Sequence, residues 1–143
     1  MVALLLGIAV SGDAFAGPAA PGTPPAGNPE RNAIMDVLRL DFYKNKDDAK
    51  KNEKKVLFVV RHLKVKDGWA CVNGLPTQRG KEVAESRWAV LKKTKDGWVD
   101  VDYFGKLRPF ATEAEAMDAL DMSKETVKRL LPKFPGCPAE IFP

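Results

Sequence analysis

The tetrapeptide Lys-Asp-Gly-Trp occurs twice, at positions 66–69 and 95–98, each time between two apolar runs. Asp-Gly in this setting is a strong signal for a tight β-hairpin, because glycine adopts the positive φ that the turn requires. The runs at 56–65 and 69–73 predict the first hairpin, and the runs at 87–93 and 99–104 predict the second. We expect two hairpins built in the same way, each with its tryptophan over the turn, in a four-stranded antiparallel sheet.

One amphipathic helix is predicted before the sheet. Asn28 is a favourable N-cap, and Pro29 suits the first helical position, where its missing N–H costs nothing. Ile34, Leu38 and Phe42 then recur every four residues and form one apolar stripe. This stripe predicts a helix that packs on the sheet.

Short helices are predicted after the sheet. Thr112 and Glu115 have the spacing of a capping box, and Ser123 can cap a further short helix that Pro132 ends. The apolar tail, with Ile141 and Phe142, is expected to pack on the body of the protein. The predicted fold class is α+β: an N-terminal helix on a four-stranded antiparallel sheet of two hairpins, followed by short C-terminal helices.

The first 28 residues differ in composition from the rest. An uncharged apolar run at 2–10 precedes Ala14-Phe15-Ala16, which offers the small residues that a signal peptidase recognises. We therefore expect a signal peptide at 1–16, a Pro/Gly/Ala-rich linker at 17–28 and a single α+β domain at 29–143. No Lys or Arg precedes the run, so an apolar N-terminus that is not a signal is the alternative. The run is too short to span a bilayer, so no transmembrane segment is expected in the mature form.

Export predicts a periplasmic or secreted location, where cysteines form disulfides. The chain has two cysteines, Cys71 and Cys137. A bond between them would stabilise the fold by about 4 kcal/mol in the chain-entropy model and would anchor the tail. The alternative is one buried and one free thiol, because spacing does not show that the two side chains meet.

The charge pattern limits the class of partner. The formal net charge is +4, and many of the lysines lie at 44–55, interleaved with acidic residues. This segment either forms a solvated loop or frayed helix end, or it is weakly attracted to anionic envelope polymers or lipid head groups. Nucleic acid is not expected as a partner, because the spacing of aromatic and basic residues typical of single-strand binders is missing.

Several motifs resemble those of uncharacterised exported bacterial domains. The first helix has Arg31, Ile34, Leu38 and Arg39 in the pattern Arg-x-x-Ile-x-x-x-Leu-Arg, and Phe-Val-Val follows at 58–60. A Gly-Trp-Ala turn stands at 68–70, and the tail closes with Pro138, Ile141 and Phe142. The layout also resembles the NTF2-like and cystatin-like arrangements, which implies a helix across a curved sheet. The resemblance rests on structural motifs and implies no particular activity.

The chain is poor in catalytic residues. His62 is the only histidine, so an imidazole-rich metal site is excluded, and no metal or cofactor is expected. Asp100 and Asp102 are expected on one face of the last strand, between Trp98 and Phe104. Two carboxylates beside aromatic rings can perform acid–base chemistry or bind a sugar. Alternatively, they form a solvated acidic row that pairs across the hairpin with Lys92 and Arg87.

Besides a purely structural envelope protein whose basic segment contacts an anionic polymer, two functions follow from these observations. The first is an exported, non-enzymatic binding or inhibitor module of the bacterial envelope, with an unknown protein or an anionic polymer as partner. Arg79, at the tip of a predicted loop at 74–80, and Trp98 are its binding candidates. The alternative is a small NTF2-like pocket enzyme or ligand carrier. Asp100, Asp102, Tyr103 and His62 are its candidate residues.

Overall fold

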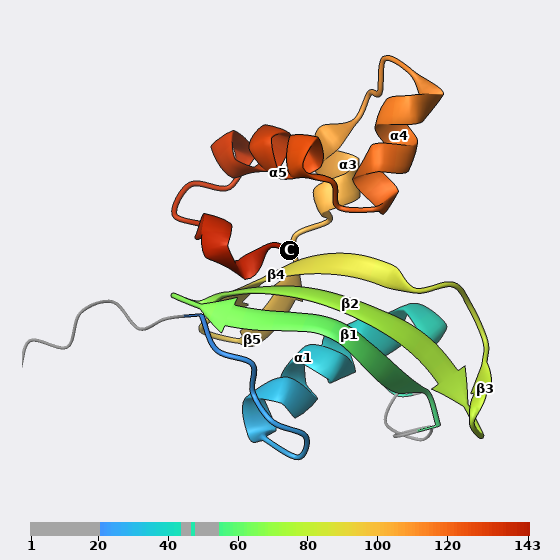
Figure 1. Ribbon diagram of the computed structural model, residues 1–143. Coiled ribbons are helices and arrows are strands. Elements are labelled where there is room, and N and C mark those ends of the chain that lie inside the picture. Colours follow the sequence, from blue (N-terminus) through green and yellow to red (C-terminus); the bar gives the residue numbers. More distant parts are fainter. Residues whose placement is uncertain (1–20, 44–46, 48–54) are drawn as a thin grey trace, which may run out of the picture.

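The structure is a computed structural model that describes residues 21–43, 47 and 55–143 (Figure 1). The predicted signal peptide, the start of the linker and most of the basic segment at 44–55 lie outside the described residues. The elements follow in the order α1 (Pro29–Arg39), η1 (Leu40–Phe42), β1 (Leu57–Lys66), β2 (Trp69–Gln78), β3 (Lys81–Glu82), β4 (Arg87–Thr94), β5 (Gly97–Asp100), α3 (Tyr103–Leu107), α4 (Glu113–Leu120), α5 (Lys124–Leu130), η2 (Leu131–Lys133) and η3 (Ala139–Ile141). This order confirms the predicted α+β class.

Helix α1 forms where its cap and its apolar stripe predict it. The Asn28 side chain accepts a hydrogen bond from the Glu30 N–H at 2.8 Å, and Pro29 occupies the first turn. Ile34 and Leu38 are completely buried against the sheet. The preceding chain is also attached to the domain, because Gly22 and Val65 exchange two backbone hydrogen bonds at the outer edge of β1. Part of the predicted linker therefore covers this edge.

The sheet is antiparallel, with strand order β1-β2-β4-β5, and the short strand β3 pairs with the end of β2. The strand β2 is longer than predicted, because residues 74–78 continue it instead of forming a loop. At Gly74 this strand passes close to β1, because a Cβ at this position would lie 3.1 Å from the Phe58 ring. The turn itself is confined to Arg79 and Gly80, which have φ values of 51° and 76°.

A bulge at Arg61 keeps the apolar side chains of both halves of β1 on the same face of the sheet. The pairing with β2 shifts between Val60 and His62, so Arg61 is the extra residue. Phe58 and Val60 before the bulge and Leu63 after it all pack in the apolar cluster beneath α1. Without the extra residue, the alternation of the strand would place its second apolar half on the opposite face.

The two Lys-Asp-Gly-Trp sequences fold differently, which corrects the expectation of two equivalent hairpins. In the first, Lys66 pairs with Trp69, so Asp67 and Gly68 form the turn, with φ values of 50° and 75°. In the second, Thr94 pairs with Gly97, so the turn begins one residue earlier relative to the motif. The Thr94 hydroxyl also bridges this turn, donating to the Gly97 carbonyl at 2.9 Å.

The two tryptophans of these sequences lie on opposite sides of the sheet. Trp98 packs with α1, whereas Trp69 packs with the C-terminal helices. The sheet therefore lies in the middle of three layers, with α1 on one face and α3, α4 and α5 over the other (Figure 1). Each face has its own apolar cluster, and β2 is buried between them.

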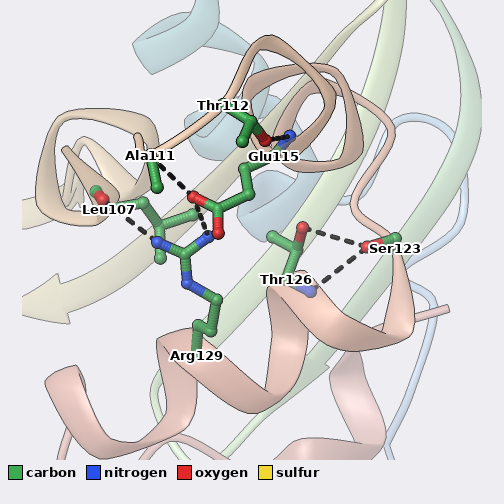
Figure 2. Close-up of polar contacts among 7 residues, drawn as sticks. All are labelled: Leu107, Ala111, Thr112, Glu115, Ser123, Thr126 and Arg129. Carbon is green, nitrogen blue, oxygen red and sulfur yellow. Dashed lines mark hydrogen bonds and ion pairs between the residues drawn. The ribbon is translucent and has the colours of Figure 1, made fainter. Parts of the chain in front are cut away.

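The C-terminal helices are held by caps and by one ion pair, which Figure 2 shows. The Thr112 hydroxyl accepts a hydrogen bond from the Glu115 N–H at 3.2 Å, as the capping box predicts. The Glu115 carboxylate reaches the Ala111 N–H at 2.9 Å, one residue before the expected partner. The same carboxylate pairs with Arg129 of α5 at 3.5 Å. The capping residues therefore also connect α4 to α5.

The predicted disulfide between Cys71 and Cys137 is wrong, because both thiols are free. They lie in the same apolar cluster, and burial raises the pKa of Cys71 above its usual range and that of Cys137 to about 11. The tail is anchored by apolar burial instead. Ile141 is completely buried and Phe142 nearly so, which confirms that the tail packs on the body.

Candidate functional site

An open groove of about 840 Å³ lies between the sheet and α4. Figure 1 shows that the C-terminal helices leave one end of the sheet uncovered, where β1 and β2 extend beyond them. The floor of the groove includes Asn73 and Leu75 of β2 and Trp88 of β4. Met117 and Leu120 of α4 form an apolar rim, and their exposed fractions are 53% and 52%.

Asn73 is the least exposed polar residue of this floor. Only 6% of it is accessible, and it lines the groove on the face that Cys71 also occupies. Its carboxamide has no hydrogen-bond partner among the residues that the structure describes. Neither polar atom of this side chain is sealed from solvent, so the amide remains accessible from the groove. The groove therefore presents one donor group and one acceptor group that are unused in the protein.

Arg87 closes one end of the groove. Its guanidinium pairs with Asp41, which follows α1, and with Asp100 of β5 at 3.0 Å. The Arg87 Nε is completely enclosed and has no partner in the described part of the chain. The ion pairs join three segments that are distant in sequence. Arg87 thus orders this end of the groove and leaves a second polar group unused.

Carboxylates outnumber guanidinium groups along the groove. Six acidic residues line it, and the two basic ones are Arg61 and Arg87. The six are Asp41, Glu82, Glu85, Asp100, Asp102 and Asp121. Within the described residues, Glu82, Glu85, Asp102 and Asp121 take part in no ion pair. The groove is therefore locally acidic on a chain whose formal net charge is +4.

Asp100, Asp102 and Tyr103 all line the groove, but not in the predicted geometry. The strand ends at Asp100, whereas it was predicted to continue to residue 104. Asp102 has a left-handed φ of 49° and caps α3, and its carboxylate accepts from the Gly105 N–H at 3.0 Å. The two carboxylates therefore do not alternate along one strand face.

Each of these three candidate residues already has a structural contact. Asp100 binds Arg87 and also accepts from the Asp102 N–H at 2.8 Å. The Tyr103 hydroxyl donates to the Ala119 carbonyl at 3.0 Å. Burial raises the pKa of Tyr103 to about 12, so its phenol remains protonated at neutral pH. Through these hydrogen bonds, the three residues stabilise the local structure of the groove wall.

His62 lies outside the groove lining. Its Nε2 is 2.7 Å from the Ile141 carbonyl, so the ring helps to hold the C-terminal tail. The ring also packs beside Trp88 of the groove floor, with 5.2 Å between the ring centroids. His62 can therefore influence the groove only through Trp88.

The two binding candidates are also outside this groove. Arg79 lines a smaller hollow at the β2–β3 turn with Lys55, Leu57, Gln78 and Gly80. Trp98 is buried beneath α1, with 8% of its surface exposed, and it cannot bind a ligand there without a rearrangement of the core. Of the predicted site residues, the fold brings together Asp100, Asp102 and Tyr103.

The sequence analysis missed Asn73 and named Arg87 only as a cross-hairpin partner of the acidic row, and Arg87 does pair with Asp100. Asn73 was placed at the end of a strand and Arg87 at the start of one, and neither belongs to a motif. One signal was present: an asparagine interrupts an otherwise apolar segment at 69–76. A lone amide in such a segment is a candidate for a buried polar contact.

No group of three or more potential metal ligands occurs in the described ranges. The same residues contain no helix with both the length and the apolar character needed to cross a bilayer. Comparisons with protein-family models, curated proteins and solved structures found no match to this chain. The groove is therefore the feature of the molecule that bears on its function.

Proposed function

We propose that this protein is an exported, non-enzymatic binding module of the bacterial envelope, and that the groove is its binding site. The observation that carries the proposal is the open groove of about 840 Å³ with an unpartnered amide on its floor. Its volume lies in the range of about 300–1,000 Å³ that is usual for ligand sites. An exposed apolar rim beside polar groups is also typical of recognition surfaces.

The contacts of the candidate catalytic residues favour binding over catalysis. A general acid or base must reach a substrate proton. Asp100 is held by Arg87, Asp102 by the first turn of α3, and Tyr103 by the Ala119 carbonyl. Each group is therefore already engaged in a structural hydrogen bond.

Export is supported by the apolar run at 2–10 and the cleavage pattern that ends at Ala16. The test is expression of the full chain in a bacterium, followed by fractionation and intact-mass analysis. We expect a periplasmic or secreted species that begins at Gly17. Full-length protein confined to the cytoplasm would contradict export.

The binding role is tested by affinity capture from a bacterial envelope extract, with mass spectrometry of the retained molecules. The double variant Met117→Ser and Leu120→Ser removes the apolar rim, and both side chains are exposed, so folding should be unaffected. Val99→Ser is the matched control, because Val99 is also exposed and does not line the groove. We expect the rim variant to lose the retained molecules and the control to keep them.

The same experiment examines the β2–β3 turn. Arg79→Asn is the suitable change, since asparagine tolerates the positive φ of this position. Loss of capture with this variant alone would move the binding site from the groove to the turn. Equal capture by all variants would contradict a role for either surface.

A further inference from the structure

We propose that the groove binds an extended peptide segment that carries lysine or arginine side chains next to apolar ones. This inference deepens the proposed binding function and rests on it. It names the class of ligand from three features of the groove: an unpartnered amide on the floor, carboxylates without ion-pair partners on the walls, and an apolar rim.

The amide of Asn73 matches a peptide backbone. A side-chain carboxamide offers an N–H donor and a C=O acceptor side by side. A peptide unit offers the complementary pair, so one ligand residue can satisfy both groups of Asn73 at once. A simple protonated polyamine has no acceptor and could not satisfy the N–H groups of this amide.

The carboxylates match cationic side chains and come from two sides. On one side, Glu82 lies in β3 and Glu85 in the segment that follows it. On the other side, Asp102 directly precedes α3 and Asp121 directly follows α4. None of the four takes part in an ion pair within the described part of the chain. A lysine or arginine bound in the groove would find an unpaired carboxylate on either wall. An anionic polymer would instead be repelled here.

The rim and the floor provide apolar contacts. Met117 and Leu120 are exposed on α4, and Trp88 and Leu75 face them from the sheet. Methionine side chains are flexible and adapt to different partners, which suits a peptide with a variable apolar residue. Apolar side chains between the basic ones would bury this surface.

The probe is a fluorescein-labelled, amidated hexapeptide that alternates lysine and leucine, and binding is followed by fluorescence anisotropy. Two control peptides change one property each. Glutamate replaces lysine in the first, and serine replaces leucine in the second. We expect binding of the lysine–leucine peptide, weaker binding of the lysine–serine peptide and none of the glutamate–leucine peptide. Added salt should weaken binding, because exposed charges are screened.

Three variants locate the peptide. Asn73→Leu should weaken binding about tenfold, since two hydrogen bonds are lost. Glu85→Gln with Asp121→Asn should weaken it about three- to tenfold. The matched control is Asp36→Asn with Glu125→Gln, which removes the same charge from exposed positions outside the groove. The control should bind as the unmodified protein does.

Three results would overturn the inference: no binding of the lysine–leucine peptide, equal binding by the groove variants and the control, or a preference for the glutamate–leucine peptide. Size-exclusion chromatography tests whether a second copy of the chain, rather than a peptide, occupies the groove. A dimer that the groove variants dissociate would also count against the peptide. If envelope molecules are still lost with the rim variant while the peptide fails, the binding function stands and only its ligand class is wrong.

Discussion

Replacing Asn73 with leucine is expected to stabilise the protein, although Asn73 is a buried residue with only 6% of its surface exposed. Leucine has nearly the shape of asparagine and carries no polar atom. The change therefore removes a polar group that has no hydrogen-bond partner among the described residues. A mutation of a buried residue ordinarily destabilises a protein, so the sign of the effect is informative.

The magnitude follows from the surroundings of the amide. An unsatisfied buried polar group costs about 1–3 kcal/mol. Asn73 lines the open groove, so water reaches part of the amide and the lower value applies. We therefore expect a gain of about 1 kcal/mol, which corresponds to a rise of about 3–6 °C in Tm for a domain of this size.

Urea denaturation followed by circular dichroism measures this gain. Thr126→Val is the matched control, because Thr126 is equally buried but its hydroxyl lies 3.1 Å from the Ser123 hydroxyl (Figure 2). This control should lose about 1 kcal/mol. If Asn73→Leu loses as much as the control, the Asn73 amide has a partner in the folded protein. The argument for a ligand amide at this position would then fail.

Three other predictions concern groups outside the groove floor. Because burial raises the pKa of Tyr103 from 10.0 to about 12, its stabilising contribution is complete below pH 10 and is lost as the pH approaches 12. Urea titrations at pH 10 and pH 12 measure the fall in the free energy of unfolding between the two values. This fall should be about 1–2 kcal/mol smaller for Tyr103→Phe than for the unmodified protein, after allowance for partial solvent screening. Maleimide should modify Cys71 only after unfolding, and intact mass without reductant should show free thiols at Cys71 and Cys137. Thr112→Ala should cost about 1 kcal/mol in urea denaturation, since the Glu115 N–H loses its cap.

Each of these three predictions has an outcome that would contradict it. A Tyr103→Phe variant with the same alkaline instability would show that other groups cause the loss. Rapid labelling of Cys71 in the folded protein would mean that its core cluster is open. An unchanged Thr112→Ala variant would show that water or another group caps α4 equally well.

Part of the candidate site could be predicted from the sequence. Asp100, Asp102 and Tyr103 were singled out because carboxylates beside aromatic residues suggest chemistry, and all three line the groove. Their geometry could not be predicted, because the strand ends at Asp100 and Asp102 takes a left-handed φ that caps α3. The pairing of Arg87 with Asp100 could be predicted from the hairpin, whereas Asn73 belongs to no motif and its place in the groove appears only when segments distant in sequence are brought together.

The cysteines show the same limit. Two cysteines in a chain with an export pattern favour a disulfide, and the fold does place both in one apolar cluster. A bond requires a specific mutual geometry of the two side chains, which spacing along the chain does not encode. The burial of Ile141 and Phe142 anchors the tail without it.

The sequence by itself determined the local elements: the cap and stripe of α1, the Asp-Gly turn at 67–68 and the caps of α4 and α5. These depend on residues within a few positions of one another, so a pattern in the chain is enough. The tertiary structure decided which way the elements face. The same tetrapeptide buries Trp69 beneath the C-terminal helices and Trp98 beneath α1, because the pairing of each strand within the sheet, and not the tetrapeptide, sets the face that its side chains occupy. The groove arises in the same way, from an end of the sheet that the C-terminal helices do not cover.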